Sequence, residues 1–140
     1  MVRKSDGKKA SQIIIRPLEK NLDAKELNKL YKKSKEIKDK FRKSQALLAV
    51  VSAGLKQDKV EFPFLEEISK EIPLTRFKVY ALRKLIEYAI ENGKKEKVKE
   101  YFEKVKEITD ENPENKWIQQ EKEIIEAIIK RNIENSLNKN

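Results

Sequence analysis

The chain lacks cysteine and histidine, and it has few residues that interrupt helices. Its 140 residues include no Cys, no His, three Gly and four Pro. Without cysteine there is no disulfide framework and no thiolate metal site. His and Cys are also the side chains most often used for general acid–base and nucleophilic catalysis. Because Gly and Pro end helices and form the turns between strands, their scarcity favours long helices.

The remaining polar residues form no recognisable catalytic, metal-binding or cofactor-binding motif. Residues 7–9 are Gly-Lys-Lys, but the earlier glycine of a phosphate-binding loop is missing. The neighbouring acids Glu121 and Glu123 are interpreted as part of a solvent-facing side of a helix. A catalytic site needs convergent groups in a pocket. Since none is indicated, we expect a protein that is not an enzyme and that uses no cofactor or metal.

Long apolar runs are absent as well. The most apolar segment, residues 46–55, is much shorter than the roughly 20 apolar residues that span a bilayer. The first nine residues are basic, but no apolar segment follows them, so a secretory signal is not predicted. We therefore expect a cytoplasmic protein with no membrane association.

What the chain does contain suits a small helical fold. It is 38% hydrophobic and 41% charged, which is enough apolar material for one thin core. We predict an all-α protein, a single-domain bundle or short helical array of about five helices with a basic disordered N-terminal tail. The predicted parts are the tail at 1–12, one helical domain at 13–135 with helices over about 24–54, 64–72, 75–92, 94–110 and 115–133, and a frayed C-terminus at 136–140.

The first helix has the clearest signals. Asp23 is placed to cap it and Glu26 completes a capping box. A seam of residues then follows at alternating spacings of three and four: Leu27, Leu30, Ser34, Ile37, Phe41, Ser44, Leu48, Val51 and Leu55. The helix either continues to residue 54 or bends near residues 42–44. Residues 46–51 are apolar around most of the helix and are predicted to lie at the buried centre of the fold.

Positive charge is concentrated in the first part of the chain. The formal net charge is +9; residues 1–60 hold 17 Lys or Arg against 7 Asp or Glu, whereas residues 61–140 hold 16 against 17. A general need for solubility would spread the excess over the whole surface. The pattern therefore indicates a localised positive field and a polyanionic partner.

The Lys-rich start of the first helix, with the basic tail before it, is the candidate binding surface. Lysines suit diffuse contact with a phosphate backbone better than bidentate reading of bases. Only Tyr31 and Phe41 are aromatic here, and both lie on or beside the seam, so base stacking is not indicated. The alternative is a solvated helix face whose lysine stems shield the core. The candidate nucleic-acid-binding residues are Lys8, Lys9, Lys25, Lys29, Lys32, Lys33, Lys40 and Lys43.

Residues 82–117 resemble a tetratricopeptide-like helical hairpin. The residues concerned are Leu82, Leu85 and Ala89 on the first helix, Gly93 at the turn, Val98, Phe102 and Val105 on the second helix, and then Pro113 and Trp117. The resemblance implies a stacked helical array with a concave face that holds a peptide or partner protein. It also implies that the N-terminal helices cap the stack.

Together these features lead to one principal functional hypothesis and two alternatives. The principal one is a non-catalytic helical accessory protein that binds nucleic acid or a nucleoprotein assembly through residues 3–43, without strong sequence specificity, and a protein through its C-terminal helices. In place of nucleic acid, the basic region could take an acidic partner protein. The alternatives are a protein–protein adaptor with a tetratricopeptide-like groove and a subunit that self-associates through the Leu27–Leu55 seam.

Overall fold

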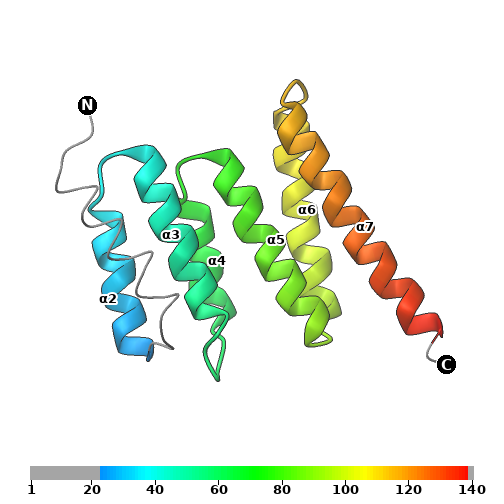
Figure 1. Cartoon of the computed structure of the whole chain (residues 1–140), viewed down its shortest axis with the longest axis horizontal. Helices are drawn as coiled ribbons and strands as arrows, with labels where there is room; N and C mark the ends of the chain where they lie inside the picture. Colours follow the sequence, from blue (N-terminus) through cyan, green and yellow to red (C-terminus); the bar gives the residue numbers. More distant parts are fainter. Residues whose placement is uncertain (1–22, 139–140) are drawn as a thin grey trace. The chain divides into compact units, whose positions relative to one another are not determined.

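The computed structural model describes residues 23–138, with side chains to residue 134, and this part of the chain is entirely helical (Figure 1). It contains α2 (Ala24–Lys35), α3 (Lys40–Gly54), α4 (Phe62–Glu71), α5 (Thr75–Glu91), α6 (Lys95–Glu111) and α7 (Lys116–Asn138). The prediction of an all-α protein is confirmed. The predicted tail at 1–12 lies outside the described residues, as do Lys8 and Lys9.

The first predicted helix, 24–54, is in fact two helices. α2 ends at Lys35, and α3 begins after Asp39, whose carboxylate accepts a hydrogen bond from the backbone N–H of Arg42 at 2.9 Å. The break therefore lies at residues 36–39, and the alternative of a bend at 42–44 is also wrong. Residue 42 is an arginine, so the Asp39 cap lacks the acidic partner of a capping box. The seam continues through the break because Ile37, in the turn, is buried.

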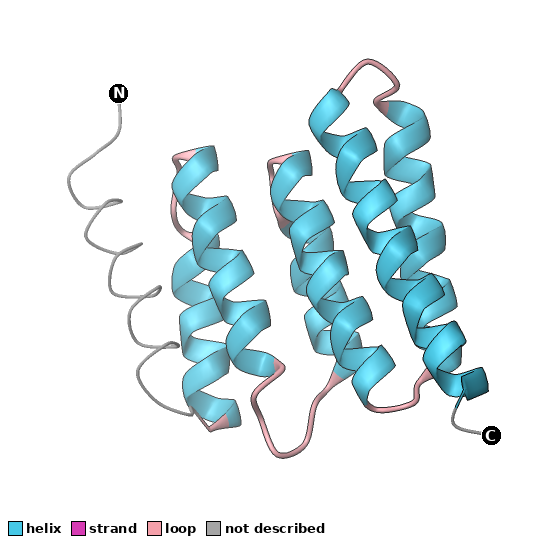
Figure 2. Ribbon diagram, turned by 45° about the vertical axis from the view of Figure 1, so that its right-hand side comes forward, coloured by secondary structure: helices cyan, strands magenta, loops and turns pink. Residues whose placement is uncertain are grey.

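The chain divides into two compact units, Met1–Ala81 and Leu82–Asn140, and the boundary falls inside α5. The prediction of a single domain over 13–135 stays a prediction. Successive helices within each unit run antiparallel and are joined by short loops (Figure 2). None of the helices in the described residues is both long enough and apolar enough to cross a membrane.

In the first unit, α3 packs against α2 and α4 and supplies the centre of the core. Ala46, Leu47, Val50 and Val51 are fully buried, as the apolar run at 46–51 predicted. α3 and α4 approach closely at Gly54, where an added Cβ would overlap a methyl group of Leu65. A glycine near the end of α3 therefore sets the distance between these two helices.

Two serines in the apolar seam are buried with their hydroxyls satisfied. The Ser34 hydroxyl donates to the backbone carbonyl of Leu30 at 2.7 Å, within α2. The Ser44 hydroxyl accepts from the backbone N–H of Leu74 at 3.1 Å, which ties the first turn of α3 to the residue preceding α5. The second serine thus holds together two segments thirty residues apart.

In the second unit, the chain reverses at Gly93 between α5 and α6, and α6 packs against α7. Gly93 has a φ of 65°, in the left-handed region that glycine adopts without a steric penalty. The core contains Leu85, Tyr101 and Ile125. α7 continues to Asn138, beyond the predicted end near 133, and the frayed C-terminus at 136–140 stays a prediction.

Glu121 is buried, which corrects its interpretation as a solvent-facing residue. Only 6% of it is exposed. Its carboxylate oxygens lie 3.3 and 3.2 Å from Nη1 of Arg83 in α5, and Nε of Arg83 also lies 2.9 Å from Glu87. A buried carboxylate needs such a partner, because removing a charge from water is costly.

Candidate nucleic-acid interface

The predicted lysines of α2 lie together on its exposed side. Lys25, Lys29, Lys32 and Lys33 are all exposed, and they are spaced four, seven and eight residues from the first, which places them on one face. The buried residues of α2 are Leu27, Leu30, Tyr31 and Ser34, which form the opposite face. These lysines therefore point away from the core of the first unit.

The other two described candidates belong to α3. Lys40 is its first residue and is exposed, whereas Lys43, in the first turn, is half-buried. Among residues 23–138, none of the six candidate lysines forms a side-chain ion pair. Lys35 differs, because its Nζ lies 3.9 Å from Glu71 and 5.0 Å from the centre of the Tyr31 ring. The candidate lysines thus remain available to a ligand, and Lys35 is used within the fold.

The turn at 36–39 gives the lysines a different arrangement from the one expected of a single long helix. A continuous helix would have placed them along a stripe of about five turns. Because α3 runs back alongside α2, Lys40 and Lys43 lie at the end of the hairpin where Lys32 and Lys33 are (Figure 1). We call this region the basic end: the last turn of α2, residues 36–39, and the first turns of α3 and α5.

α5 adds an arginine and its aromatic neighbours to the basic end. The guanidinium carbon of Arg76 lies 5.2 Å from the centre of the Phe77 ring. That ring makes an edge-on contact with Phe41 of α3, with centroids 5.5 Å apart. Phe41 is 45% exposed, although the seam predicted an inward position. Sequence reasoning missed Arg76, since nothing local connects it with lysines more than thirty residues earlier.

The acidic groups near the basic end are largely engaged within the fold. Asp39 caps α3, and Glu71 accepts a hydrogen bond from the Tyr31 hydroxyl and faces Lys35. The N-termini of α3 and α5 add partial positive charge through their backbone amides. The C-terminus of α2 carries partial negative charge and opposes this effect. The same charge stabilises the basic residues in the last turn of α2.

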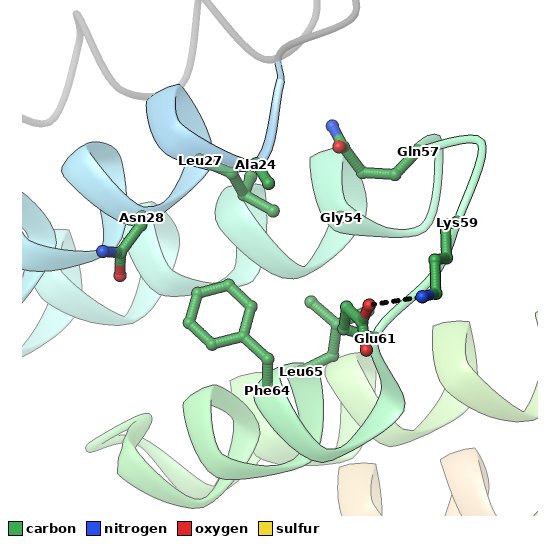
Figure 3. Close-up of a pocket in the computed structure, with 9 residues that line it drawn as sticks. All are labelled: Ala24, Leu27, Asn28, Gly54, Gln57, Lys59, Glu61, Phe64 and Leu65. Atoms are coloured by element: carbon green, nitrogen blue, oxygen red, sulfur yellow. Dashed lines mark ion pairs between the residues drawn. The ribbon is translucent and has the colours of Figure 1, made fainter.

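A small pocket in the first unit lies away from the basic end, beside the first turn of α2 (Figure 3). Its volume is about 250 Å³, and Leu27, Phe64 and Leu65 form much of its apolar wall. An ion pair of 3.9 Å between Lys59 and Glu61 lies at its edge. The pocket offers no cluster of convergent polar groups, and we assign it no ligand.

The described residues hold no group of three or more acidic side chains arranged to bind a metal ion. Comparison with family models, with curated proteins and with solved structures finds no match for this chain. The hairpin that resembles a tetratricopeptide unit is present as the end of α5, Gly93 and α6, but membership of that family stays a prediction.

Proposed function

We propose that this protein is a non-catalytic helical accessory protein that binds the phosphate backbone of nucleic acid through its basic end. The observation that carries the proposal is the convergence of three helices there. Lys32 and Lys33 come from α2, Lys40 and Lys43 from α3, and Arg76 from α5. A duplex carries one negative charge per roughly 1.7 Å of its axis, so a cationic cluster of this kind complements it.

Binding of this type does not depend strongly on base sequence. Most of the cationic groups are lysines, which act as point charges and cannot read guanine with a bidentate fork. Phe41 is exposed beside them, but a single aromatic residue does not form the stacking platform of single-strand binding proteins. We therefore expect affinity for both duplex DNA and structured RNA, with a steep dependence on salt concentration.

The alternatives are less well supported. Self-association through the seam would need Leu27, Leu30 and Val51, which are at most 4% exposed within the chain itself. An acidic protein partner would use the same lysines, so substitutions alone do not distinguish it from nucleic acid. A direct titration with DNA and RNA does. Against a purely solvated helix face, Arg76 lies over the Phe77 ring, and that ring contacts Phe41 in the first turn of α3, so a cationic group from α5 joins those of α2 and α3.

The test is a fluorescence anisotropy titration of the full chain with labelled duplex DNA and structured RNA at low and physiological salt. We expect micromolar or tighter binding at low salt. Each phosphate contact contributes about 0.9 to the slope of log affinity against log salt. Changing Lys29, Lys32, Lys33 and Lys40 together to Glu should abolish binding.

A matched control changes four exposed lysines of the second unit, Lys84, Lys94, Lys116 and Lys130, to Glu. It alters the net charge by the same amount and should retain most of the affinity. An equal loss in both quadruple variants would mean that only the overall charge matters. No binding at low salt would overturn the proposal and leave an acidic protein as the partner of the basic end.

A further inference from the structure

The second unit has an apolar groove formed by α6, α7 and the end of α5. Its volume is about 460 Å³. The apolar lining residues are Ile90, Val98, Phe102, Ile129 and Ile133, and the polar ones are Lys95, Lys99 and Asn132. The groove is larger than the pocket beside α2, and it lies outside the region to which the proposed function assigns nucleic acid.

One wall of this groove is formed by an apolar side chain that is largely exposed to solvent. Ile133 is 55% exposed, more than any other large hydrophobic side chain in the described residues. Burying an isoleucine side chain is favourable, so leaving it in water forgoes part of that gain. Ile133 lines the same groove as Ile129, Val98 and Phe102, which are half-buried, so the groove presents several apolar side chains together.

The charge of the groove is of one sign. None of its lining residues is acidic, and Lys95 and Lys99, four residues apart on α6, lie on the same side of that helix. Both are exposed, and within residues 23–138 neither forms an ion pair. By contrast, Lys97 and Lys106 of the same helix each lie 3.4 Å from a glutamate of α6. A ligand with a carboxylate at its edge would complement the two lysines of the groove.

We propose that this groove binds an amphipathic helix of a partner protein whose apolar face is flanked by acidic residues. The apolar lining would take side chains at positions i, i+3 or i+4, and i+7 of the ligand helix. Lys95 and Lys99 would contact its carboxylates, which sets the orientation of the helix and disfavours basic ligands. Ile133 would form the far wall and become buried on binding.

The test is a selection from a displayed library of helix-forming peptides of about 16 residues against the full-length protein. The enriched peptides should combine a stripe of Leu, Ile or Phe with neighbouring Asp or Glu. Their affinity, measured by anisotropy, should fall at least tenfold in Ile133→Glu. The matched control is Ile124→Glu, which changes another exposed isoleucine of α7 that does not line the groove.

A charge reversal checks the role of the two lysines. The double variant Lys95→Glu, Lys99→Glu should bind the selected acidic peptides at least tenfold more weakly than the wild type does. Peptides in which Lys replaces Glu should bind the double variant better than they bind the wild type. The double variant Lys84→Glu, Lys116→Glu serves as the control for net charge, and circular dichroism verifies folding of every variant.

Three outcomes would overturn the proposal. One is a selection that enriches peptides without acidic residues, or that enriches no peptide. Another is equal loss of affinity in the groove variants and in their controls. The third is a concentration-dependent dimer in sedimentation that Ile133→Glu abolishes, because the groove would then bind a second copy of this chain.

Discussion

Tyr31 shows how one residue links two helices of the first unit. Its ring packs edge-on against Phe64 of α4, with centroids 5.3 Å apart, and its hydroxyl donates a hydrogen bond to Glu71 at the end of the same helix. Burial, then the hydrogen bond and the charge of Glu71, raise the pKa of Tyr31 well above its ordinary value. The folded protein thus retains the phenolic proton at a pH where the unfolded chain loses it.

We predict that Tyr31→Phe changes how the free energy of unfolding falls as the pH rises above 10. At neutral pH the variant should be less stable by about 1–2 kcal/mol, because a hydrogen bond to a carboxylate is lost. The stability due to the raised pKa is fully present below the unfolded value of 10.0 and is lost as pH rises toward the folded value. Between about pH 10 and 12 the wild type should therefore lose stability faster than the variant, by up to about 1.4 kcal/mol per pH unit.

Urea unfolding followed by circular dichroism at a series of pH values measures both effects. All other ionisable groups are common to the two proteins, so the difference between their curves isolates Tyr31. Parallel curves above pH 10 would show that Tyr31 titrates alike in the folded and unfolded states.

At the scale of the elements, α5 and α7 are joined by an ion pair between the half-buried Arg83 and the buried Glu121. Arg83 lies between Glu87 on its own helix and Glu121 on α7. Burial lowers the pKa of Arg83, but hydrogen bonds and charge from the two glutamates outweigh that effect, and the pKa is raised. Because Glu87 is exposed, its ion pair with Arg83 adds little to the stability of the fold, although its hydrogen bond helps to raise the pKa of Arg83. The contact with Glu121 is the one that connects α5 with α7.

We predict that Arg83→Met destabilises the protein by about 2–3 kcal/mol, because it leaves the Glu121 carboxylate buried without its partner. Glu121→Met in addition should recover most of the loss, since the pair is then replaced by apolar side chains of similar volume. A double-mutant cycle by urea unfolding measures the coupling, with Glu87→Gln as the control for the exposed contact. Additive effects of the two Met substitutions would contradict a coupled pair.

At the scale of the whole molecule, the two units differ in net charge. Residues 23–81 contain 14 Lys or Arg and 9 Asp or Glu, whereas residues 82–138 contain 12 and 13. The basic excess of the described chain thus belongs to the first unit. The groove of the second unit has its own two lysines in an otherwise balanced region. The proposed nucleic-acid interface and the proposed helix-binding groove therefore differ in how strongly salt should affect them.

The membership of Arg76 in the basic end can be tested directly. Arg76→Ala should weaken nucleic-acid binding and reduce the salt slope by about 1, as expected for one lost phosphate contact. Arg131→Ala removes an exposed arginine of α7 and should leave the slope unchanged. Anisotropy titrations at four or more salt concentrations provide the slopes, and thermal melts check the Arg76 variant because its guanidinium covers Phe77. Equal slopes for the two variants would remove Arg76 from the interface.

Sequence alone was sufficient to predict the helical class, the approximate ranges of α4, α5 and α6, the start of α2 and α7, and the buried centre at 46–51. These features follow from local physics: caps, breakers and the 3.6-residue period act within a few residues of each other. The exposed side of α2 was predictable for the same reason, since its lysines alternate with the buried seam.

Only the tertiary structure decided the break at 36–39, the burial of Glu121 and the contact of Phe41 with Phe77, the ring that Arg76 covers. A helical seam keeps its spacing whether the helix continues or turns back on itself, so periodicity could not locate the break. The burial of Glu121 and the place of α5 at the basic end depend on contacts between residues more than thirty positions apart, Glu121 with Arg83 and Phe77 with Phe41. No local pattern encodes those contacts. The basic end and the groove of α6 and α7 are products of packing between helices, because each draws its residues from three of them.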